Sequence, residues 1–306
     1  MGHRMIELLK DNYMYGTGHG KDWHVHIEPP KRKVKSYYEE SVEAIEYIYA
    51  NKTGKFQVLY SGGIDGQYVI ELLMRLKMPF DTVIIQIRNS EGQLLNGHET
   101  VYAYEFCKSR NITPITYELN FTEFVESGRM LEIANSITCC SMALPGTMHV
   151  CSQLDGFMLL GNDPPYLRNE NGTWLVEEVE YSHGLLRFFE KNKLNGAPFF
   201  LQYTAEMELA FLLDPAIKKL ASNVDPGRKG SNSTKALVFN NGSDFNIPVY
   251  DFSTAKKKYT GYERIYTSEF ALTHPNLTIY RDLRAKWNGE YLEPYDKLVE
   301  RLSINQ

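Results

Sequence analysis

A serine, two glycines and an aspartate stand together in one short stretch, Ser61-Gly62-Gly63-Ile64-Asp65-Gly66. Glycines leave room for backbone N–H groups to approach a bulky anion such as a phosphate chain. Ser61 adds a hydroxyl donor, and Asp65 offers a carboxylate that can hold a magnesium ion bridging phosphate oxygens. These residue types at this spacing predict a phosphate-binding loop.

The sequence on either side predicts that this loop joins a strand to a helix. An apolar run over residues 56–60 favours a strand. A helical spacing of apolar residues follows the glycines, at Val69, Leu72, Leu73 and Leu76. A glycine turn that opens a helix aims several N–H groups at one point, where the helix dipole adds partial positive charge. An ordinary strand-to-helix turn is the alternative interpretation.

The loop differs from the two commonest nucleotide-binding patterns, since neither G-x-x-x-x-G-K-S/T nor G-x-G-x-x-G occurs in the chain. Ser61 to Gly66 instead resembles the S-G-G-x-D-S signature of the PP-loop (N-type) ATP pyrophosphatases. This superfamily includes the asparagine synthetase ligase domain, GMP synthetase, tRNA-modifying thiolases and PAPS reductases. Gly66 stands where the family has its last serine, so one hydroxyl contact to pyrophosphate is missing.

The resemblance covers about residues 55–165 and implies a site for ATP and Mg²⁺. Enzymes of this superfamily usually cleave ATP between the α and β phosphates, which adenylates a substrate and releases pyrophosphate. By this resemblance the nucleotide contacts are Tyr60, Ser61, Gly62, Gly63, Ile64, Asp65, Gly66 and Ile87, with adenine near Tyr60 and Ile87. Asp65 is also the expected magnesium ligand and a catalytic residue.

Strand and helix patterns alternate through the same region. Strands are expected at about 56–60, 82–87, 112–119 and 156–161, and helices at about 36–50, 99–110 and 121–126. Val101, Tyr104 and Cys107 are inward candidates on the second of these helices. Such alternation predicts an α/β fold with a doubly wound parallel sheet, which the resemblance identifies as Rossmann-like (HUP-type).

Ligands of such sheets bind beyond the carboxyl ends of the strands, so the segments 60–61, 87–89 and 161–163 should converge. Asp163 is therefore an expected second metal ligand or ribose contact. A turn that initiates before Pro164 is the alternative explanation for this aspartate.

The chain is expected to have three parts. Residues 1–50 form an N-terminal extension with a leading helix, 51–165 the nucleotide-binding core, and 166–306 a mainly helical C-terminal lobe. In the lobe, a turn at 169–172 joins two short strands, and helices are expected at 184–193, 204–213 and 215–222. The polar segment 222–234 is expected to be a mobile surface loop.

A basic segment near the C-terminus, Lys256 to Arg264, offers four cations, two tyrosines and a glycine. In the family, a lysine or arginine from the C-terminal part often closes on the ATP phosphates, where cations balance charge on the leaving pyrophosphate. Lys258 is accordingly an expected catalytic residue beside Asp65. A solvated basic turn is the alternative.

Four cysteines, Cys107, Cys139, Cys140 and Cys151, raise a second hypothesis. Some PP-loop enzymes carry sulphur on a cysteine or hold an iron–sulphur cluster. The chain has no C-x-x-C pair and lacks the E-C-G-x-H tail of PAPS reductases. Inert packing in the core is the favoured interpretation of these cysteines.

Composition restricts the class of protein. The 306 residues are 43% hydrophobic and 23% charged, with a net charge of −5, which is typical of a globular protein. This charge does not indicate a nucleic-acid partner and does not exclude one. The absence of an apolar run of 18 residues or of an apolar signal core near Met1 predicts a cytoplasmic protein without a membrane span.

The sequence thus predicts an asparagine synthetase-like ligase that adenylates a carboxylate or carbonyl oxygen for attack by a nitrogen nucleophile. Related enzymes often have a glutaminase whose cysteine follows the initiator methionine, whereas Gly2 follows Met1 here. The expected partners are therefore ATP, a small-molecule acceptor, and ammonia, an amine or a separate amine-donating protein. The alternatives are a sulphur-metabolism enzyme and an ATP-binding module without turnover, which the Gly66 departure would allow.

Overall fold

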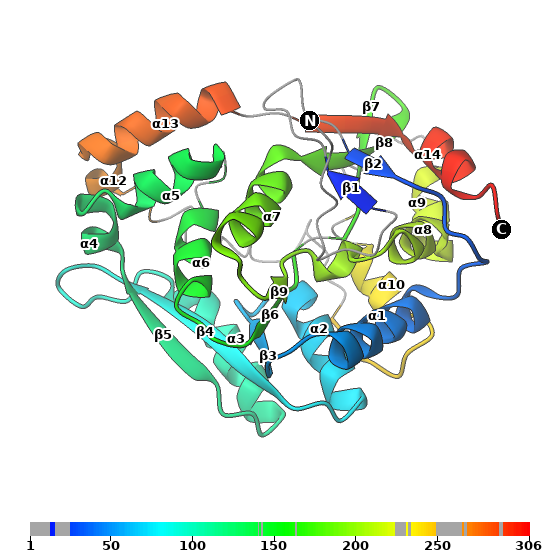
Figure 1. Cartoon of the computed structure of the whole chain (residues 1–306), viewed down its shortest axis with the longest axis horizontal. Helices are drawn as coiled ribbons and strands as arrows, with labels where there is room; N and C mark the ends of the chain where they lie inside the picture. The colour runs from blue at the N-terminus through cyan, green and yellow to red at the C-terminus, as the bar shows by residue number, and fades with distance from the viewer. Residues whose placement is uncertain are drawn as a thin grey trace.

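The computed structural model describes residues 13–15, 25–139, 141, 143–162, 164–223, 231, 234–248, 265, 268–287 and 290–306. Its centre is a five-stranded parallel sheet in the order β5-β4-β3-β6-β9 (Figure 1). The strands are β3 (Phe56–Leu59), β4 (Phe80–Arg88), β5 (Ile115–Asn120), β6 (Phe157–Leu160) and β9 (Gly196–Ala197). The expected α/β fold with a parallel sheet is confirmed.

Strand order puts a topological switch point beside β3. The chain steps from β3 outward to β4 and β5, and then returns to β6 on the other side of β3. Connections on the two sides of a switch point leave in opposite directions, which opens a crevice at the carboxyl ends of the strands. The loop that follows β3 lies at this crevice, as the resemblance to PP-loop proteins implies.

Helices cover both faces of the sheet. Figure 1 shows α1 and α2, in blue, on one side and α5, α6 and α7, in green, on the other. The helices of this half are α1 (Tyr37–Asn51), α2 (Ile64–Arg75), α3 (Gly97–Ser109), α4 (Phe121–Glu126), α5 (Arg129–Ile137), α6 (Leu144–Cys151) and α7 (Glu180–Asn192).

The inward face of α3 differs from the expected one. Its buried residues are Glu99, Thr100, Ala103 and Cys107. Val101 is 43% exposed, so its expected inward position is wrong. Residues 99, 103 and 107 follow each other at intervals of four and share one side of a helix, whereas position 101 falls on the opposite side.

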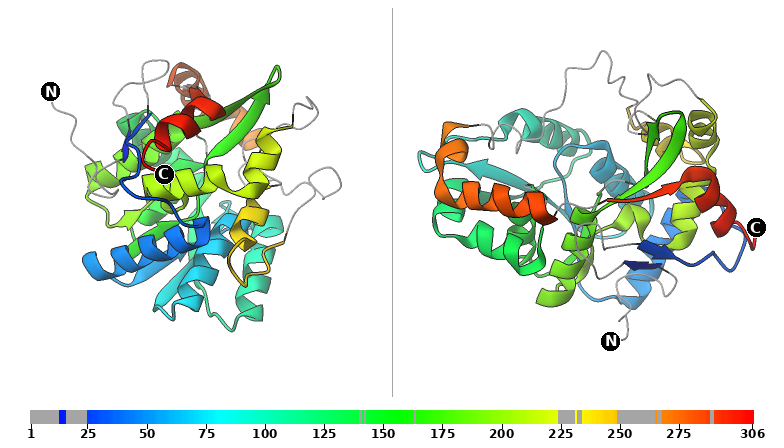
Figure 2. Two further views of the ribbon diagram at one scale, coloured as in Figure 1. Left: turned by 90° about the vertical axis from the view of Figure 1, so that its right-hand side faces the viewer. Right: turned by 90° about the horizontal axis from the view of Figure 1, so that it is seen from above.

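The C-terminal part contains a second sheet besides its helices. The three antiparallel strands lie in the order β10-β8-β7 (Figure 2). They are β7 (Tyr166–Glu170), β8 (Thr173–Val179) and β10 (Glu290–Pro294). The hairpin of β7 and β8 was expected, and β10 was not. Two further strands, β1 (Tyr13–Tyr15) and β2 (Val25–Ile27), pair near the N-terminus.

The helices of this part are α8 (Ala205–Leu213), α9 (Pro215–Ala221), α10 (Lys235–Asn240), α12 (Glu269–Thr273), α13 (Pro275–Trp287) and α14 (Tyr295–Leu302). In the part of the chain that the structure covers, none of the helices is long and apolar enough to cross a membrane. The division at residues 50 and 165 stays a prediction.

Stacked aromatic rings fix α10 against α1 and α2. The ring of Tyr68, on α2, stacks on Phe239, on α10, with centroids 4.4 Å apart. Tyr37, on α1, stacks on Phe239 at 6.0 Å and on Tyr68 at 5.8 Å. Aromatic pairs of this kind add about 0.5–1.5 kcal/mol beyond the apolar area they bury. They hold the start of α10 close to the start of α2.

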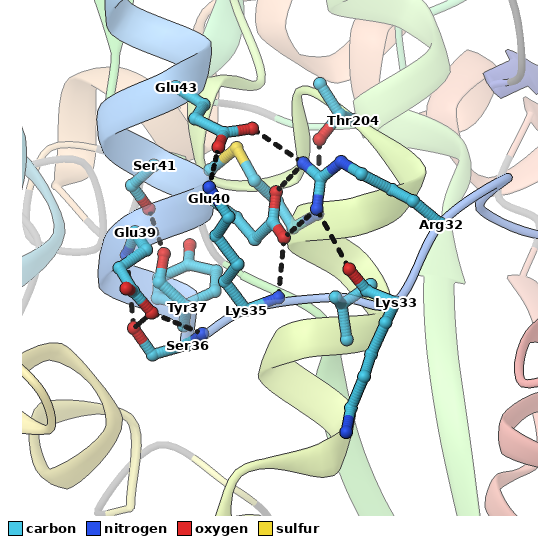
Figure 3. Close-up of polar contacts among 12 residues, drawn as sticks. Arg32, Lys33, Lys35, Ser36, Tyr37, Glu39, Glu40, Ser41, Glu43 and Thr204 are labelled. Carbon is cyan, nitrogen blue, oxygen red and sulfur yellow. Dashed lines mark hydrogen bonds and ion pairs between the residues drawn. The ribbon is translucent and has the colours of Figure 1, made fainter. Parts of the chain in front are cut away.

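A network of charges anchors the segment before α1 (Figure 3). The guanidinium of Arg32 donates to both carboxylate oxygens of Glu40, at 2.7 and 2.6 Å, and to Glu43 at 2.6 Å. The Glu40 side chain is only 1% exposed. Ser36 and Glu39 complete a capping box at the start of α1, as the expected helix start near residue 36 requires.

Candidate functional site

A cavity of about 170 Å³ lies at the carboxyl ends of β3, β4 and β6. It collects six of the sequence-predicted site residues: Tyr60, Ser61, Gly63, Asp65, Gly66 and Ile87. Gly161 and Asn162, from the end of β6, line it as well, so the three expected strand ends do converge. Gly62 and Ile64 belong to the same loop but are not among the residues that line the cavity; Ile64 is 6% exposed and packs in the core.

Gly62 brings the loop close to the backbone of α3. Its φ of +88° lies in the left-handed region that favours glycine. A Cβ added here would lie 2.9 Å from the backbone nitrogen of Ala103 and 3.1 Å from the carbonyl oxygen of Glu99. A larger residue would therefore be strained and would also collide with α3. The glycine is required for the loop to take this path.

The first turn of α2 provides the backbone donors. Gly63 is the N-cap residue, and its carbonyl accepts the first helical hydrogen bond from Gln67 at 3.0 Å. The N–H groups at the beginning of a helix have no carbonyl within the helix to bind. Together with the helix dipole, they favour an anion next to Ser61, whose side chain is exposed.

Gly66 lies in close contact with β3 and β6. A Cβ added to Gly66 would lie 2.8 Å from Cδ2 of Tyr60. A Cβ added to Gly161 would lie 2.6 Å from the nitrogen of Gly66 and 2.7 Å from the carbonyl carbon of Asp65. The start of α2 thus packs between the Tyr60 ring and the end of β6.

An ion pair joins the loop to the C-terminal part. Lys235 Nζ, at the start of α10, lies 2.7 Å from Oδ2 of Asp65. Their side chains are 9% and 17% exposed, respectively. Because lysine is almost never buried without a partner, this pair is an organised feature of the site. It puts one cation and one carboxylate at the Ser61–Gly66 loop.

Lys235 was missed in the sequence, where Lys258 was the expected cation. It stands at the end of a polar segment and belongs to no motif. One signal could have identified it: Phe239 follows at i+4, so the lysine shares a helix side with a large apolar residue. Lys258 and the rest of Lys256–Arg264 lie outside the described residues.

Asn96 holds the end of β4 in place. Its Oδ1 accepts from the N–H of Ile87 at 2.9 Å, and its Nδ2 donates to the carbonyl of Ile85 at 2.8 Å. Ile87 is thereby fixed at the wall of the cavity, where adenine is expected. Glu99 and Thr100, both buried, also line this wall.

Two buried side chains, Tyr37 and Glu208, interact electrostatically in the core. Glu208, on α8, is fully buried. Burial raises the pKa of the Tyr37 hydroxyl well above its ordinary value, and electrostatic interactions with Tyr68, Asp65 and Glu208 raise it further. Tyr37 therefore stays neutral and donates to the carbonyl of Leu201 at 2.7 Å.

Asp163, the expected second magnesium ligand, lies outside the described residues. Its neighbour Asn162 donates to the carbonyl of Pro198 at 2.9 Å. Over the described ranges no group of three or more His, Cys, Asp or Glu side chains could hold a metal ion. Among the described residues that line the cavity, the carboxylates are those of Asp65 and Glu99.

The described cysteines are buried. Cys107, Cys139 and Cys151 have 0% exposure. Burial raises the pKa of the Cys107 thiol to about 11, and burial also raises the pKa of Cys151. A thiol with a raised pKa is a poor nucleophile at neutral pH. Cys140 lies outside the described residues.

No protein-family model matches the chain, and no curated protein matches it. Among solved structures, it is similar to NMN synthetase from Francisella tularensis, with 17% identity and a TM-score of 0.26. The match covers 40% of this chain and 52% of the other, so it spans about half of that synthetase. The chain is also similar to the U34-tRNA thiolase NcsA from Methanococcus maripaludis, determined with its 4Fe–4S cluster. That match has 10% identity and a TM-score of 0.31 and covers 81% and 79% of the two chains.

Proposed function

We propose that this chain is an ATP-dependent adenylating enzyme of the PP-loop type. The observation that carries the proposal is the Ser61–Gly66 loop at the switch point of the sheet, with the Lys235–Asp65 ion pair beside it. Its partners would be ATP, a small-molecule acceptor, and ammonia, an amine or an amine-donating protein. The first candidate for its reaction is an asparagine synthetase-like amidation.

The loop suits the β and γ phosphates of ATP. Gly62 and Gly66 let the loop pack closely against α3 and the Tyr60 ring, and the start of α2 supplies backbone donors. The Ser61 hydroxyl adds a donor at the exposed edge. Lys235 adds a positive charge that is already held at the loop by Asp65. Donors fixed before the substrate arrives stabilise developing charge most effectively.

Asp65 fits the role of a magnesium ligand. Mg²⁺ in nucleotide sites is usually held by one or two carboxylates plus phosphate oxygens. When bound, the ion would offset charge that builds on the leaving pyrophosphate. Engagement of Asp65 in this role would release the ammonium group of Lys235 for the phosphates.

In the proposed reaction, an acceptor oxygen from a carboxylate or carbonyl attacks the α phosphorus. The bond from this phosphorus to the bridging oxygen breaks, and pyrophosphate leaves with the electron pair. Lys235 and the N–H groups of α2 stabilise that leaving group. A nitrogen nucleophile then displaces AMP from the activated acceptor.

The test is a product analysis with ATP labelled at the α phosphate, which follows AMP, and in a parallel reaction at the γ phosphate, which follows pyrophosphate. The wild type, incubated with Mg²⁺ and pools of carboxylate and amide metabolites, is expected to form AMP and pyrophosphate in equal amounts. The Ser61→Ala variant serves as the site control and should lose most of the activity. ADP and phosphate as the only products would contradict the proposal. Binding of ATP without any product would favour the non-catalytic module.

A sulphur-transfer function is not favoured by the described cysteines. Such a route needs a thiolate that attacks, carries a persulfide or binds a cluster. Cys107 and Cys151 are buried with raised pKa values, and Cys139 is buried beside the carbonyl of Ser141. Asparagine synthetase-like chemistry therefore stays the first candidate.

A further inference from the structure

We propose that Tyr60 is a positioning residue whose ring occupies the space of the side chain that residue 66 lacks. The inference rests on the proposed function of the Ser61–Gly66 loop. It explains why Gly66 departs from the serine of the motif. In this chain the hydroxyl is sterically excluded by Tyr60, so Tyr60 and Gly66 form an interdependent pair.

Tyr60 is held firmly in place. The residue is only 3% exposed, and its N–H donates to the carbonyl of Val83 at 2.9 Å. Its ring meets the Phe106 ring of α3 edge to face, with centroids 5.4 Å apart. Edge-to-face contact is a preferred geometry for aromatic pairs. The ring therefore cannot swing away from Gly66 without breaking a packed contact with α3.

Gly66 has no free space on the Tyr60 side. The position of a Cβ on Gly66 lies 2.8 Å from ring carbon Cδ2, which is shorter than real Cβ contacts allow. The obstacle is a ring carbon of a buried residue, so relief requires a shift of the ring or of α2. Cores packed at native density resist such shifts.

On the opposite side, the first turn of α2 packs against the backbone at the end of β6. Gly161 allows the end of β6 to approach the nitrogen of Gly66, where its own Cβ would lie at 2.6 Å. The start of α2 is thus fixed from both sides, by a ring and by a strand. This packing sets the positions of the N–H groups that would bind pyrophosphate. Tyr60 acts through the loop and need not touch the phosphates.

Two consequences distinguish this role from simple core packing. Adding a side chain at position 66 should displace the N–H groups, so that pyrophosphate binding weakens. Removing the ring at the same time should restore room, and a serine hydroxyl at position 66 should then gain a contact with the anion. An alanine at position 66 would also fit once the ring is removed, but it has no hydroxyl to contact the anion.

The experiment measures the dissociation constant of Mg-pyrophosphate by calorimetry, together with the thermal midpoint. The variants are Gly66→Ser, Tyr60→Val, and the double variants Tyr60→Val/Gly66→Ser and Tyr60→Val/Gly66→Ala. Gly97→Ser is the matched control, because Gly97 also lies in the first turn of a helix but faces only the flexible end of Leu94, 3.0 Å from an added Cβ.

We expect Gly66→Ser to bind pyrophosphate at least tenfold more weakly than the wild type, and Gly97→Ser to bind it normally. Tyr60→Val/Gly66→Ser should bind at least fivefold more tightly than either Gly66→Ser or Tyr60→Val/Gly66→Ala. If the two substitutions have additive effects on affinity and on the thermal midpoint, the proposed interdependence of Tyr60 and Gly66 is refuted. If the wild type binds neither pyrophosphate nor ATP, the proposed function is refuted instead. The thermal midpoints of the single and double variants would still show whether the Tyr60 ring and residue 66 are coupled.

Discussion

Replacing Lys235 by methionine tests how strongly the site depends on its ion pair. The substitution keeps the length of the side chain and leaves Asp65, 17% exposed, without this lysine. Breaking a buried ion pair by removing one partner costs about 3–5 kcal/mol. Because Asp65 keeps some contact with solvent, we expect a loss near the lower limit, about 3 kcal/mol. At about 2 °C per kcal/mol for a chain of this size, the thermal midpoint should fall by about 6 °C.

Affinity for Mg-ATP should fall as well. Loss of a charge-assisted hydrogen bond to phosphate is worth about 1.5–3 kcal/mol, which corresponds to roughly 10- to 150-fold in the dissociation constant. The double variant Lys235→Met/Asp65→Asn should recover most of the stability, since no buried charge is left alone, while ATP binding stays weak.

Calorimetric titration and thermal unfolding measure both effects. Lys219→Met, at an exposed lysine in the last turn of α9, is the matched control and should change stability by no more than about 0.5 kcal/mol. The reasoning is refuted if Lys235→Met keeps both the thermal midpoint and the Mg-ATP affinity of the wild type. A loss of stability with unchanged affinity would limit Lys235 to a structural role.

Three further predictions concern other parts of the chain. Arg32→Met should lower the free energy of unfolding by about 3 kcal/mol in denaturant titrations, because Glu40 stays buried without its bidentate partner; an effect below about 0.5 kcal/mol would contradict this. In a Cys140→Ser background, iodoacetamide at pH 8 should label the remaining cysteines only after denaturation. These cysteines are buried, and the pKa values of Cys107 and Cys151 are raised. Labelling of the native protein within minutes would be inconsistent with this burial. Burial, aided by the Arg129 charge, lowers the pKa of His149 below 6.5. The folded state therefore binds fewer protons than the unfolded state, and stability should decline as the pH falls below 6.5. His149→Gln should flatten this decline in thermal scans, and identical pH profiles of the variant and the wild type would argue against it.

The sequence allowed the core of the fold to be predicted because its signals are local. The apolar run before Ser61, the glycines, and the helical period of Val69, Leu72 and Leu73 lie within one short segment, and all three apolar residues are buried as this period requires. The parallel arrangement followed from the alternation of strands and helices.

What the sequence did not reveal depends on contacts between distant segments. β10 pairs with β8 across more than a hundred residues, and its five residues carry no strong strand pattern. The same applies to Lys235. It lies beside Asp65 because stacked aromatic rings hold α10 against α1 and α2. Gly66 could be recognised as a departure, but only the geometry identifies Tyr60 as its cause.

The distance along the chain between Asp65 and Lys235 bears on how the protein is made. A ribosome releases the strands and helices of the parallel sheet well before residue 235, so the nascent domain has a carboxylate at its loop without this lysine. Domains generally begin to fold from the N-terminal side during synthesis. The Ser61–Gly66 loop would therefore gain its ion pair only after α10 has emerged and stacked on Tyr68. If the loop binds nucleotide as proposed, binding during translation would then be delayed until α10 has been made.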